Sequence, residues 1–567
     1  MTIFAKERPD ASRLSFEGAG KVTVNQAQAR VGLTMLLVVL AYSLIIGRLA
    51  LLGLTEPEKT IATQAKDIAI TATRPDIRDR NGEMLATDIV TSSLFAEPRR
   101  IVDADEAVEK LAGVLPDLDV KSVYKRLTSN AGFVWLKREL TPAKENEILA
   151  LGIPGIGFRT ETRRFYPKGE TASHIVGHVN IDNVGIAGLE KYIDDRGLEE
   201  LRSLGLAADR EMEPVYLSVD LRVQHFVRDE LAKAMNRYSA IAAGAVVLNV
   251  KTGEIVAMSS LPDYDPNRPV DALKKDRLNR ISAGLFEMGS TFKTFTTAMA
   301  LDSGKVSIND RFDATKALRI GKHTINDFHA KRRVLSVPEV FIYSSNIGTA
   351  KMADVVGVNG HREFLHRVGL LSRMPFELPE VAHPVEPKKW RKIHSVTISY
   401  GHGAQTTPLQ TAVAGAALVN GGKLISPTLF PRSQALAERE ATRVISAATS
   451  NHMRNLMRLN VERGSGRRAE VPGFRVGGKT GTAEKVVNGR YSSDKRFNAF
   501  LAAFPIDDPQ YIVLVFVDEP KPEKGKKSAT AGLNAAPVVG NIIRRSAPVL
   551  GIRPDYGDVS NPLLISN

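Results

Sequence analysis

The residues of this chain best suited to chemistry lie in the segment Glu287-Met288-Gly289-Ser290-Thr291-Phe292-Lys293. Gly289 favours a turn, and Ser290 can cap or open the helix that the apolar-rich residues up to Leu301 predict. Ser290 and Lys293 then lie on one face of the first turn. A serine becomes a nucleophile when a base takes its proton, and a lysine is that base when burial and nearby positive charge lower its pKa. The spacing by itself more often describes a capping serine and a solvated lysine.

Two later groups give this spacing a context. Ser344-Ser345-Asn346 has the form Ser-x-Asn, and Lys479-Thr480-Gly481-Thr482 has the form Lys-Thr-Gly-Thr. The three groups in this order are the signature of penicillin-recognising serine acyltransferases. The chain resembles the class B penicillin-binding proteins, most closely the FtsI-type transpeptidases of bacterial cell division. The resemblance extends from about Arg74 to Pro554.

The resemblance implies a catalytic role for several of these residues. Ser290 is expected to be the nucleophile, Lys293 the base for acylation, and Ser344 the relay that passes a proton to the departing amine. The backbone N–H groups of Ser290 and Thr482 are expected to form the oxyanion hole. No cofactor and no metal ion is expected. His174 and His178 are four apart but have no third ligand nearby in the sequence.

The remaining residues are expected to bind the substrate. Asn346 offers its amide group, and Lys479 adds positive charge that keeps the base neutral and attracts a carboxylate. Thr480 and Thr482 offer hydroxyls to that carboxylate, and Gly481 lets the substrate backbone approach the strand edge. The substrate so implied is a peptidoglycan stem peptide ending in D-Ala-D-Ala. The enzyme would crosslink it to an amine of a neighbouring stem during septal wall synthesis, and β-lactam antibiotics would acylate the same serine.

A nucleotide hydrolase is the alternative from a different enzyme class. Gly473-x-x-x-x-Gly478-Lys479-Thr480 fits a phosphate loop, and Ile512 to Asp518 resembles the strand that ends in an acid in such enzymes. A phosphate loop needs a helix directly after it. Gly481 and the turn at Asn488-Gly489 instead predict a β-hairpin, so the sequence favours the transpeptidase.

Three alternatives closer to the transpeptidase stay open. An elongation-specific class B transpeptidase shares all three groups, although Asp518 to Lys521 looks more like the division type. A β-lactamase also needs a placed water and a second base, for which no motif stands out. A catalytically silent scaffold of the division machinery is disfavoured because every residue of the three groups is present.

Length, charge and cysteine content limit the remaining possibilities. The chain has 567 residues, a formal net charge of +14 and no cysteine. Such a length predicts about two to four domains, and the lack of thiols excludes disulfides and cysteine catalysis. Basic chains bind nucleic acid, anionic membrane surfaces or acidic polymers. The charges here are dispersed and no nucleic-acid-binding motif is present, so membrane and cell wall are favoured and no nucleic-acid partner is expected.

The first part of the chain predicts a membrane anchor. Residues 1–30 form a polar arm, and residues 31–54 are uncharged apart from Arg48, which gives about the twenty residues that span a bilayer. The long arm favours an uncleaved transmembrane helix over a signal peptide. Because the catalytic groups imply a substrate outside, we expect a single-pass protein of the bacterial inner membrane at the septum, with its N-terminus in the cytoplasm and its catalytic domain in the periplasm. The resemblance implies a division-specific membrane glycosyltransferase and other divisome membrane proteins as partners.

The rest of the chain is expected to form a non-catalytic, dimerisation-type pedestal at 55–215, a transpeptidase domain at 216–553 and a tail at 554–567. The segment order predicts a mixed sheet covered by helices, with a helical subdomain. The resemblance implies an α+β fold of the penicillin-binding transpeptidase type, whose sheet is antiparallel. The expected elements are a hairpin at Asn81-Gly82, helices at 106–115, 142–151 and 537–550, strands at 243–249, 255–259, 498–504 and 511–517, and helices alternating with short loops from 290 to about 340.

Overall fold

The computed structural model describes Leu33 and residues 35–48, 74–203, 213–487, 489–526 and 528–556, and at 196–203 and 493 it gives the backbone only. The chain divides into two compact units, Met1–Ala72 and Thr73–Asn567. The expected polar arm at 1–30 lies outside the described residues. Of the expected transmembrane segment at 31–54, the described residues are helical and exposed. Within the described chain, no helix combines the length and the apolar content needed to cross a bilayer.

The second unit begins with a β-hairpin. Strand β1 (Ile77–Arg78) pairs antiparallel with β2 (Met84–Ala96). The buried carboxylate of Asp79 accepts hydrogen bonds from the backbone N–H groups of Asn81 (2.8 Å) and Glu83 (2.9 Å). Short Asp side chains favour turns by bonding the backbone just ahead of them. The expected hairpin is therefore confirmed, and Asp79 is the side chain that stabilises its turn.

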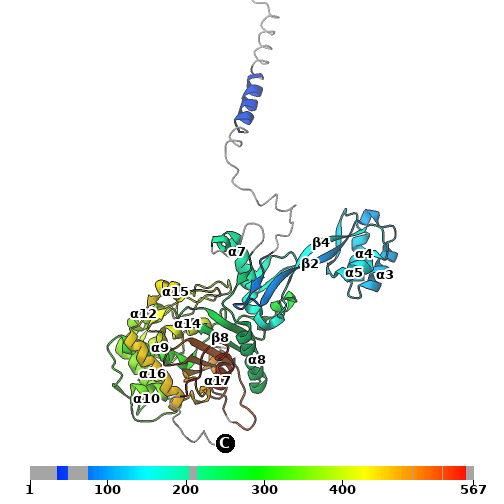
Figure 1. Cartoon of the computed structure of the whole chain (residues 1–567). Helices are drawn as coiled ribbons and strands as arrows, with labels where there is room; N and C mark the ends of the chain where they lie inside the picture. Colours follow the sequence, from blue (N-terminus) through cyan, green and yellow to red (C-terminus); the bar gives the residue numbers. More distant parts are fainter. Residues whose placement is uncertain are drawn as a thin grey trace, which may run out of the picture. The chain divides into compact units, whose positions relative to one another are not determined.

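Strand β2 is central to the first sheet. It pairs antiparallel with both β3 (Val134–Leu140) and β4 (Ile156–Phe165), while β1 also pairs parallel with β7 (Val215–Tyr216). The apolar side chains of β2 and β3 pack with three short helices, which Figure 1 shows gathered at one end of β2 and β4. These helices are α3 (Ala104–Val114), α4 (Val120–Leu127) and α5 (Pro142–Leu149). The helices expected at 106–115 and 142–151 are thus confirmed as α3 and α5.

A buried ion pair stabilises the other end of this sheet. Arg164 Nε of β4 lies 2.7 Å from Glu190 Oε1, and both side chains are fully buried. Arg164 also pairs with Asp88 (3.1 Å), and Arg74 pairs with Glu190 (2.8 Å). Removing one partner of such a pair leaves an uncompensated buried charge, so these residues hold β2, β4 and the helix of Glu190 together. The elements in this region are α6 (Ser173–Val176), β5 (His178–Val179), β6 (Gly185–Ala187) and α7 (Gly188–Ser203).

The later part of the unit is built on one five-stranded sheet with the order β16-β17-β18-β8-β9. Two strands come from the beginning of this part of the chain, β8 (Ala242–Asn249) and β9 (Ile255–Leu261). The other three come from the end of this part: β16 (Gly477–Val487), β17 (Arg490–Phe504) and β18 (Tyr511–Asp518). All neighbouring strands are antiparallel. The mixed sheet expected from the segment order is wrong, because the one long-range pairing in this sheet, β18 with β8, is also antiparallel. The antiparallel sheet that the resemblance implies is confirmed. The four expected strands are confirmed, with β17 beginning earlier than expected.

Alternate residues of the central strands face two different cores, as the period of a β-strand requires. On β18, Ile512 and Leu514 belong to one core, whereas Val513 and Val515 belong to the other. Helices on both faces therefore cover a sheet that is apolar on both sides, and its central strands read as continuous apolar runs.

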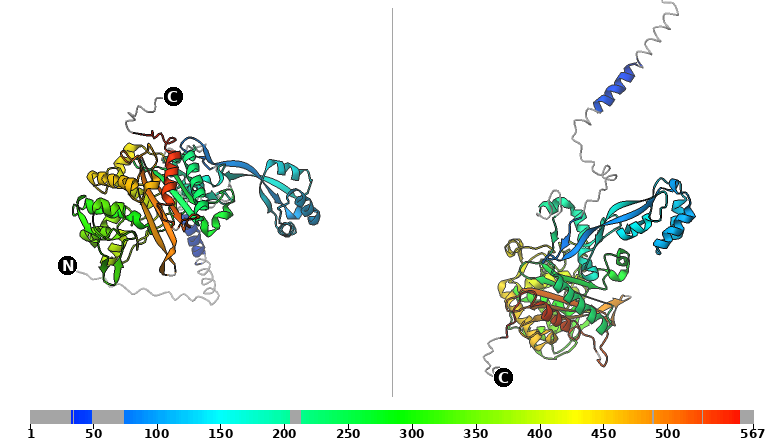
Figure 2. Two further views of the ribbon diagram at one scale, coloured as in Figure 1. Left: turned by 90° about the horizontal axis from the view of Figure 1, so that it is seen from below. Right: turned by 45° about the vertical axis from the view of Figure 1, so that its right-hand side comes forward.

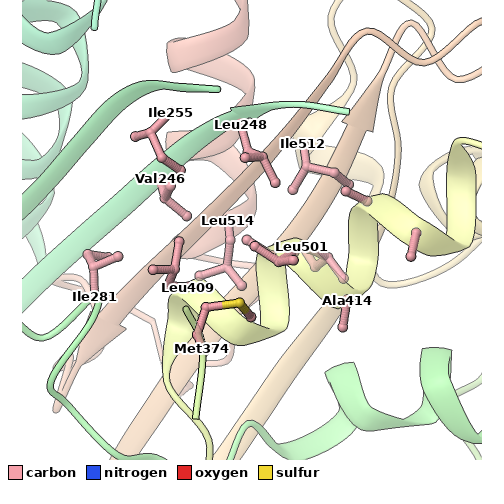
Figure 3. Packing of buried hydrophobic residues seen from close by; sticks show 14 of the residues in the cluster. Val246, Leu248, Ile255, Ile281, Met374, Leu409, Ala414, Leu501, Ile512 and Leu514 are labelled. Atoms are coloured by element: carbon pink, nitrogen blue, oxygen red, sulfur yellow. The ribbon is translucent and has the colours of Figure 1, made fainter. Parts of the chain in front are cut away.

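The first core lies between the sheet and α14 (Pro408–Val419), whose residues are all buried. Figure 3 shows Leu409 of this helix beside Leu514 of β18. The second core lies under α8 (Leu221–Tyr238) and α17 (Ala535–Ser546), which run beside each other on the opposite face (Figures 1 and 2). The expected closing helix is α17, shifted toward the N-terminus so that Pro537 falls in its first turn, where proline is tolerated.

A largely helical region separates the two groups of strands. It contains α9 (Phe292–Asp302), α10 (Val337–Ile342), α11 (Asn346–Val356), α12 (Val358–Arg367), α13 (Lys392–Ser399), α15 (Gln434–Glu440) and α16 (Ala447–Arg463). Between 290 and 340 the expectation of helices and loops alone is wrong. Two small antiparallel pairs lie there, β10 (Arg311–Asp313) with β13 (Val334–Ser336) and β11 (Leu318–Ile320) with β12 (His323–Ile325). Strands of three residues are too short to show a clear alternating pattern.

Candidate active site

The expected nucleophile lies in a single turn of 3-10 helix. Residues Gly289–Thr291 form this turn, and α9 follows directly. Within the described chain the Ser290 side chain caps no helix. Instead Thr291 Oγ1 donates a hydrogen bond to the Met288 carbonyl (2.6 Å) and stabilises the turn. The sequence allowed Ser290 either to cap the helix or to open it. The structure confirms that Ser290 opens the helix, and its side chain is not the cap.

Two other chain segments meet behind this turn. Gly289 has a φ of +53°, and a Cβ on it would lie 2.6 Å from the Thr482 carbonyl oxygen. Gly401 has a φ of +94°, and its Cβ would lie 1.9 Å from the Gly289 carbonyl oxygen. The Gly289 N–H also donates to the Gly401 carbonyl (3.3 Å). Only glycine fits at position 289 and at position 401. The turn at Gly401 and strand β16 therefore together fix the position of the turn that carries Ser290.

Glu287 connects the same segments through its side chain, and no role was expected for it. Its carboxylate accepts hydrogen bonds from His402 Nδ1 (2.9 Å), the Gly403 N–H (2.8 Å) and the Tyr491 hydroxyl (3.1 Å). Burial raises the pKa of Tyr491, and Glu287 raises it further, so the hydroxyl keeps the proton that it donates. An acidic residue directly before the Met-Gly-Ser turn was the sequence signal that could have pointed to it.

The two lysines of the site are buried, and their amines meet at one hydroxyl. Lys293 is 1% exposed and Lys479 is 0% exposed. Each Nζ lies 3.1 Å from Ser344 Oγ, and Lys293 Nζ also donates to the Ser344 carbonyl. Ser344 therefore joins the two amines. Within the described chain no hydrogen bond links Ser290 Oγ to Lys293 Nζ.

Burial lowers the pKa of both amines. For Lys293 the pKa falls well below its usual range because of burial first and the positive charge of Lys479 second, while Asp327 opposes the shift. Burial lowers the pKa of Lys479 to about 7. A neutral lysine amine has a lone pair that can take a proton. The arrangement can thus supply a base close to Ser344.

Ser344 has an unusual backbone conformation that its neighbours maintain. Its φ is +56°, which is uncommon for a residue other than glycine. Ser345 Oγ accepts a hydrogen bond from the Gly348 N–H (3.0 Å) and donates one to Asp327 Oδ2 (2.7 Å). Asn346 Nδ2 donates to the Asn326 carbonyl (2.9 Å). Ser345 is a residue that sequence reasoning missed, although a serine directly before a helical run is typical of an N-cap.

Strand β16 carries the third group. Thr480 Oγ1 shares a hydrogen bond with Ser465 Oγ (2.5 Å), and Thr482 Oγ1 accepts one from the Ala531 N–H (3.1 Å). A Cβ on Gly481 would lie 2.3 Å from the Met288 carbonyl oxygen. The lack of a side chain at Gly481 is therefore required by the protein's own nucleophile turn, a reason different from the approach of substrate that the sequence suggested.

These residues surround a cavity of about 750 Å³. Six of the eight expected site residues line it: Ser290, Lys293, Ser344, Asn346, Thr480 and Thr482. Lys479 and Gly481 lie behind the wall, Lys479 against Ser344 and Gly481 against the nucleophile turn. The chain thus brings all eight residues together, although their three groups lie far apart in the sequence. A serine hydroxyl, a buried amine and a relay hydroxyl in one cavity are the components of acyl transfer.

The same geometry contradicts the phosphate-loop alternative. Gly478, Lys479 and Thr480 lie inside β16, paired with Ala502, Leu501 and Phe500 of β17. The strand continues to Val487 and turns into β17. A phosphate loop needs the N-terminus of a helix at this point, and a strand lies there instead.

Comparison with known proteins gives the family. A profile described as penicillin binding protein transpeptidase domain matches residues 243–544, and one described as penicillin-binding protein dimerisation domain matches residues 69–202. The probable peptidoglycan D,D-transpeptidase FtsI of Caulobacter vibrioides is 40% identical over 490 residues, which cover 85% of this chain and 82% of the relative. The probable peptidoglycan D,D-transpeptidase PenA of Neisseria meningitidis is 36% identical, with 85% of each chain covered. The peptidoglycan D,D-transpeptidase FtsI of Escherichia coli is 29% identical, with 91% of each chain covered. The chain therefore belongs to the penicillin-binding transpeptidases of class B.

Proposed function

We propose that this protein is a peptidoglycan D,D-transpeptidase, which crosslinks stem peptides ending in D-Ala-D-Ala through a Ser290 acyl-enzyme during septal wall synthesis. β-Lactams acylate the same serine. The strongest support for the proposal is the position of two buried lysine amines. Each lies 3.1 Å from Ser344 Oγ, in the wall of the cavity that Ser290 also lines. Acyl transfer by a serine needs such a base and proton relay beside the nucleophile.

Acylation uses the three catalytic residues in turn. Ser290 Oγ attacks the carbonyl carbon of the penultimate D-Ala, and neutral Lys293 takes the hydroxyl proton. The backbone N–H groups of Ser290 and Thr482 stabilise the negative charge that develops on the carbonyl oxygen. Ser344 passes a proton to the nitrogen of the terminal D-Ala, the C–N bond breaks, and D-Ala leaves.

Transfer reverses these roles. An amine of a neighbouring stem attacks the ester carbonyl and gives up a proton, the new C–N bond forms, and Ser290 Oγ leaves with a proton. Positive charge on Lys479 keeps Lys293 neutral while the substrate is bound, since two cations this close to one hydroxyl repel each other.

The other residues of the three groups bind the donor stem. Asn346 bonds its amide backbone, and Thr480 and Thr482 bond its terminal carboxylate, with Lys479 supplying the charge. Gly481 lets strand β16 pack against the nucleophile turn, so that both face one substrate.

The cellular setting is proposed from the sequence and from the names of the relatives. Residues 1–30 lie in the cytoplasm, 31–54 cross the inner membrane once, and 55–215 form the pedestal that holds the transpeptidase domain (216–553, followed by a tail at 554–567) in the periplasm. Two relatives, of Caulobacter vibrioides and Escherichia coli, bear the name FtsI, which favours division over elongation. A division-specific membrane glycosyltransferase and other divisome membrane proteins are the proposed partners.

Fluorescent penicillin tests the proposal on the full-length protein in detergent. Mass spectrometry should place one covalent adduct on the peptide that contains Ser290. Ser290→Ala should lose the label, whereas Ser303→Ala, directly after helix α9, should keep it. A folded wild type that takes no label, or one labelled elsewhere, contradicts the proposal. Magnesium-dependent binding of ATP or GTP lost in Lys479→Ala would instead restore the nucleotide-hydrolase alternative.

A further inference from the structure

The cavity wall carries an excess of positive charge. Six lysine and arginine side chains line the cavity, and a single acid, Glu484, opposes them. Glu484 faces Arg496 across the β16–β17 pair, and Lys331 Nζ lies 4.6 Å from the ring centre of Tyr343. Lys293 is the neutral base of the proposed reaction. The remaining three basic residues, which we call the arginine wall, are Arg463, Arg467 and Arg468.

No residue of the arginine wall forms an ion pair within the described part of the chain. Arg463 is the last residue of α16, and Arg467 and Arg468 lie in the short 3-10 helix that follows. Arg458, earlier on α16, differs from all three. Arg458 Nε lies 2.9 Å from Glu462 and its guanidinium also bonds Glu470 (2.5 Å). The nearest acids in the sequence are thus already paired. Unpaired cations on one wall of a cavity raise its positive potential and attract an anionic ligand.

The arginine wall has a defined position relative to the strand that carries Thr480. Ser465, between the arginines, shares a 2.5 Å hydrogen bond with Thr480 Oγ1. Asn460 Nδ2 donates to the Gly478 carbonyl (2.7 Å), and Asn460 Oδ1 accepts from the Ser465 N–H (3.3 Å). On the other side, a Cβ on Gly532 would lie 2.7 Å from the Ser465 carbonyl oxygen. The backbone of this segment is therefore held between β16 and the chain at Gly532, and its arginines line the same cavity as Thr480.

We propose that the arginine wall binds a second carboxylate of the stem peptide, distinct from the terminal carboxylate of D-Ala-D-Ala. The inference rests on the proposed function and names a specificity of the same site. A guanidinium presents paired N–H donors that match a carboxylate in a bidentate way. Thr480 and Thr482 on β16 bind the terminal carboxylate, so a free carboxylate elsewhere on the peptide is the group left for the arginines. The enzyme should therefore prefer stems whose second carboxylate is free over stems in which it is amidated.

Matched synthetic peptides test this with the full-length protein in detergent. In the donor arm, peptides that end in D-Ala-D-Ala carry upstream either a free glutamate side chain or its primary amide. In the acceptor arm, amine-bearing peptides carry the same pair of groups. The readout is the ratio of kcat/KM for the free acid to that for the amide, measured for the acylation step in the first arm and for the transfer step in the second.

Wild type should favour the free acid about tenfold, the effect of one charge-assisted contact at a partly exposed site. The ratio should fall as ionic strength rises. The ratio of kcat/KM for acid over amide should approach one in the combined variant, which carries Arg463→Gln, Arg467→Gln and Arg468→Gln. Arg439→Gln, an exposed arginine of α15 outside the cavity, should keep the wild-type ratio. A preference confined to one arm identifies which of the two stems carries the bound carboxylate.

The outcomes separate this inference from the proposed function. Fluorescent penicillin labelling of wild type reports the function alone. If wild type is labelled but treats acid and amide alike in both arms, the inference is wrong and the function stands. A preference that survives the combined variant also overturns it. If that variant does not fold, Arg467→Gln replaces it, and the wild-type ratio with its salt dependence still decides the question.

Discussion

Replacing Lys479 with methionine should stabilise the fold while it damages the active site. Lys479 is fully buried, and burial lowers its pKa from 10.5 to about 7. At pH 7 the unfolded lysine is protonated, and burying the amine therefore costs about 4 kcal/mol, at about 1.4 kcal/mol per pKa unit. Methionine removes this cost but takes a hydrogen-bond partner from Ser344, which costs about 1 kcal/mol. The net gain in free energy of unfolding is about 3 kcal/mol at pH 7.

The gain should depend on pH in a direction that follows from the shift. Between pH 7 and 10.5 the unfolded lysine binds more protons than the folded one, so the stability of wild type rises with pH. At pH 9.5 the cost of burying Lys479 has fallen to about 1 kcal/mol. The advantage of Lys479→Met should therefore be close to zero at that pH. Acylation by penicillin should be slowed by at least about ten- to hundredfold in the same variant, since a charge-assisted contact is lost.

The two tryptophans allow a simple assay. Trp135 lies in β3 and Trp390 lies in the transpeptidase part, so a Trp135→Phe background leaves Trp390 as the only tryptophan reporter of that part. Urea unfolding followed by its fluorescence at pH 7 and pH 9.5 gives the difference in stability between this background and the same background with Lys479→Met. A lower stability of Lys479→Met at pH 7, or a difference that does not change with pH, would refute the reasoning that burial dominates at this lysine.

Four further outcomes are expected. Lys293→Ala should keep the fold and slow penicillin acylation by about 10²–10⁴-fold, because general-base assistance is lost; stopped-flow acylation at wild-type rate would exclude Lys293 as the base. Gly481→Ala should lower the free energy of unfolding by about 1–3 kcal/mol and slow acylation, since its Cβ would lie 2.3 Å from the Met288 carbonyl oxygen; unchanged urea midpoints would contradict this. Glu287→Ala should slow acylation more than Glu438→Ala on the exposed helix α15, because only Glu287 links the turn at 401–403 and the β16–β17 hairpin to the nucleophile turn; equal rates would remove it from the site. Protease added outside intact spheroplasts should digest the large domain and spare residues 1–30, and digestion of the arm alone would reverse the proposed topology.

Much of the site was predictable because its chemistry is local. Ser290 and Lys293 share one turn of chain, and the Ser-x-Asn and Lys-Thr-Gly groups are each a few residues long. Strands such as β18 were predictable because both faces of the sheet are covered, which leaves an uninterrupted apolar run. Thr141 accepts a hydrogen bond from the Lys144 N–H and caps α5, with Pro142 in the first turn. This cap and the hairpin at β1 follow from equally local rules.

Other features depend on contacts between distant segments. Ser344 meets both lysine amines only because α9, the turn before α11 and β16 pack together, and no spacing in the sequence encodes that three-way contact. The reason for glycine at Gly481 became clear only when the nucleophile turn was seen to fill the space of its Cβ. Glu287 likewise gains its partners from a turn and a hairpin far along the chain.

The sequence by itself determined which residue types were available for acyl transfer and which local elements carry them, because helix caps, turns and apolar periodicity are short-range properties. The tertiary structure alone decided the antiparallel pairing of β18 with β8 against the expectation from segment order, the buried environment that lowers the lysine pKa values and the three arginines that have no ion-pair partner among the described residues of the cavity wall. These are consequences of burial and of long-range pairing, whose energies depend on neighbours that the linear order of residues does not specify.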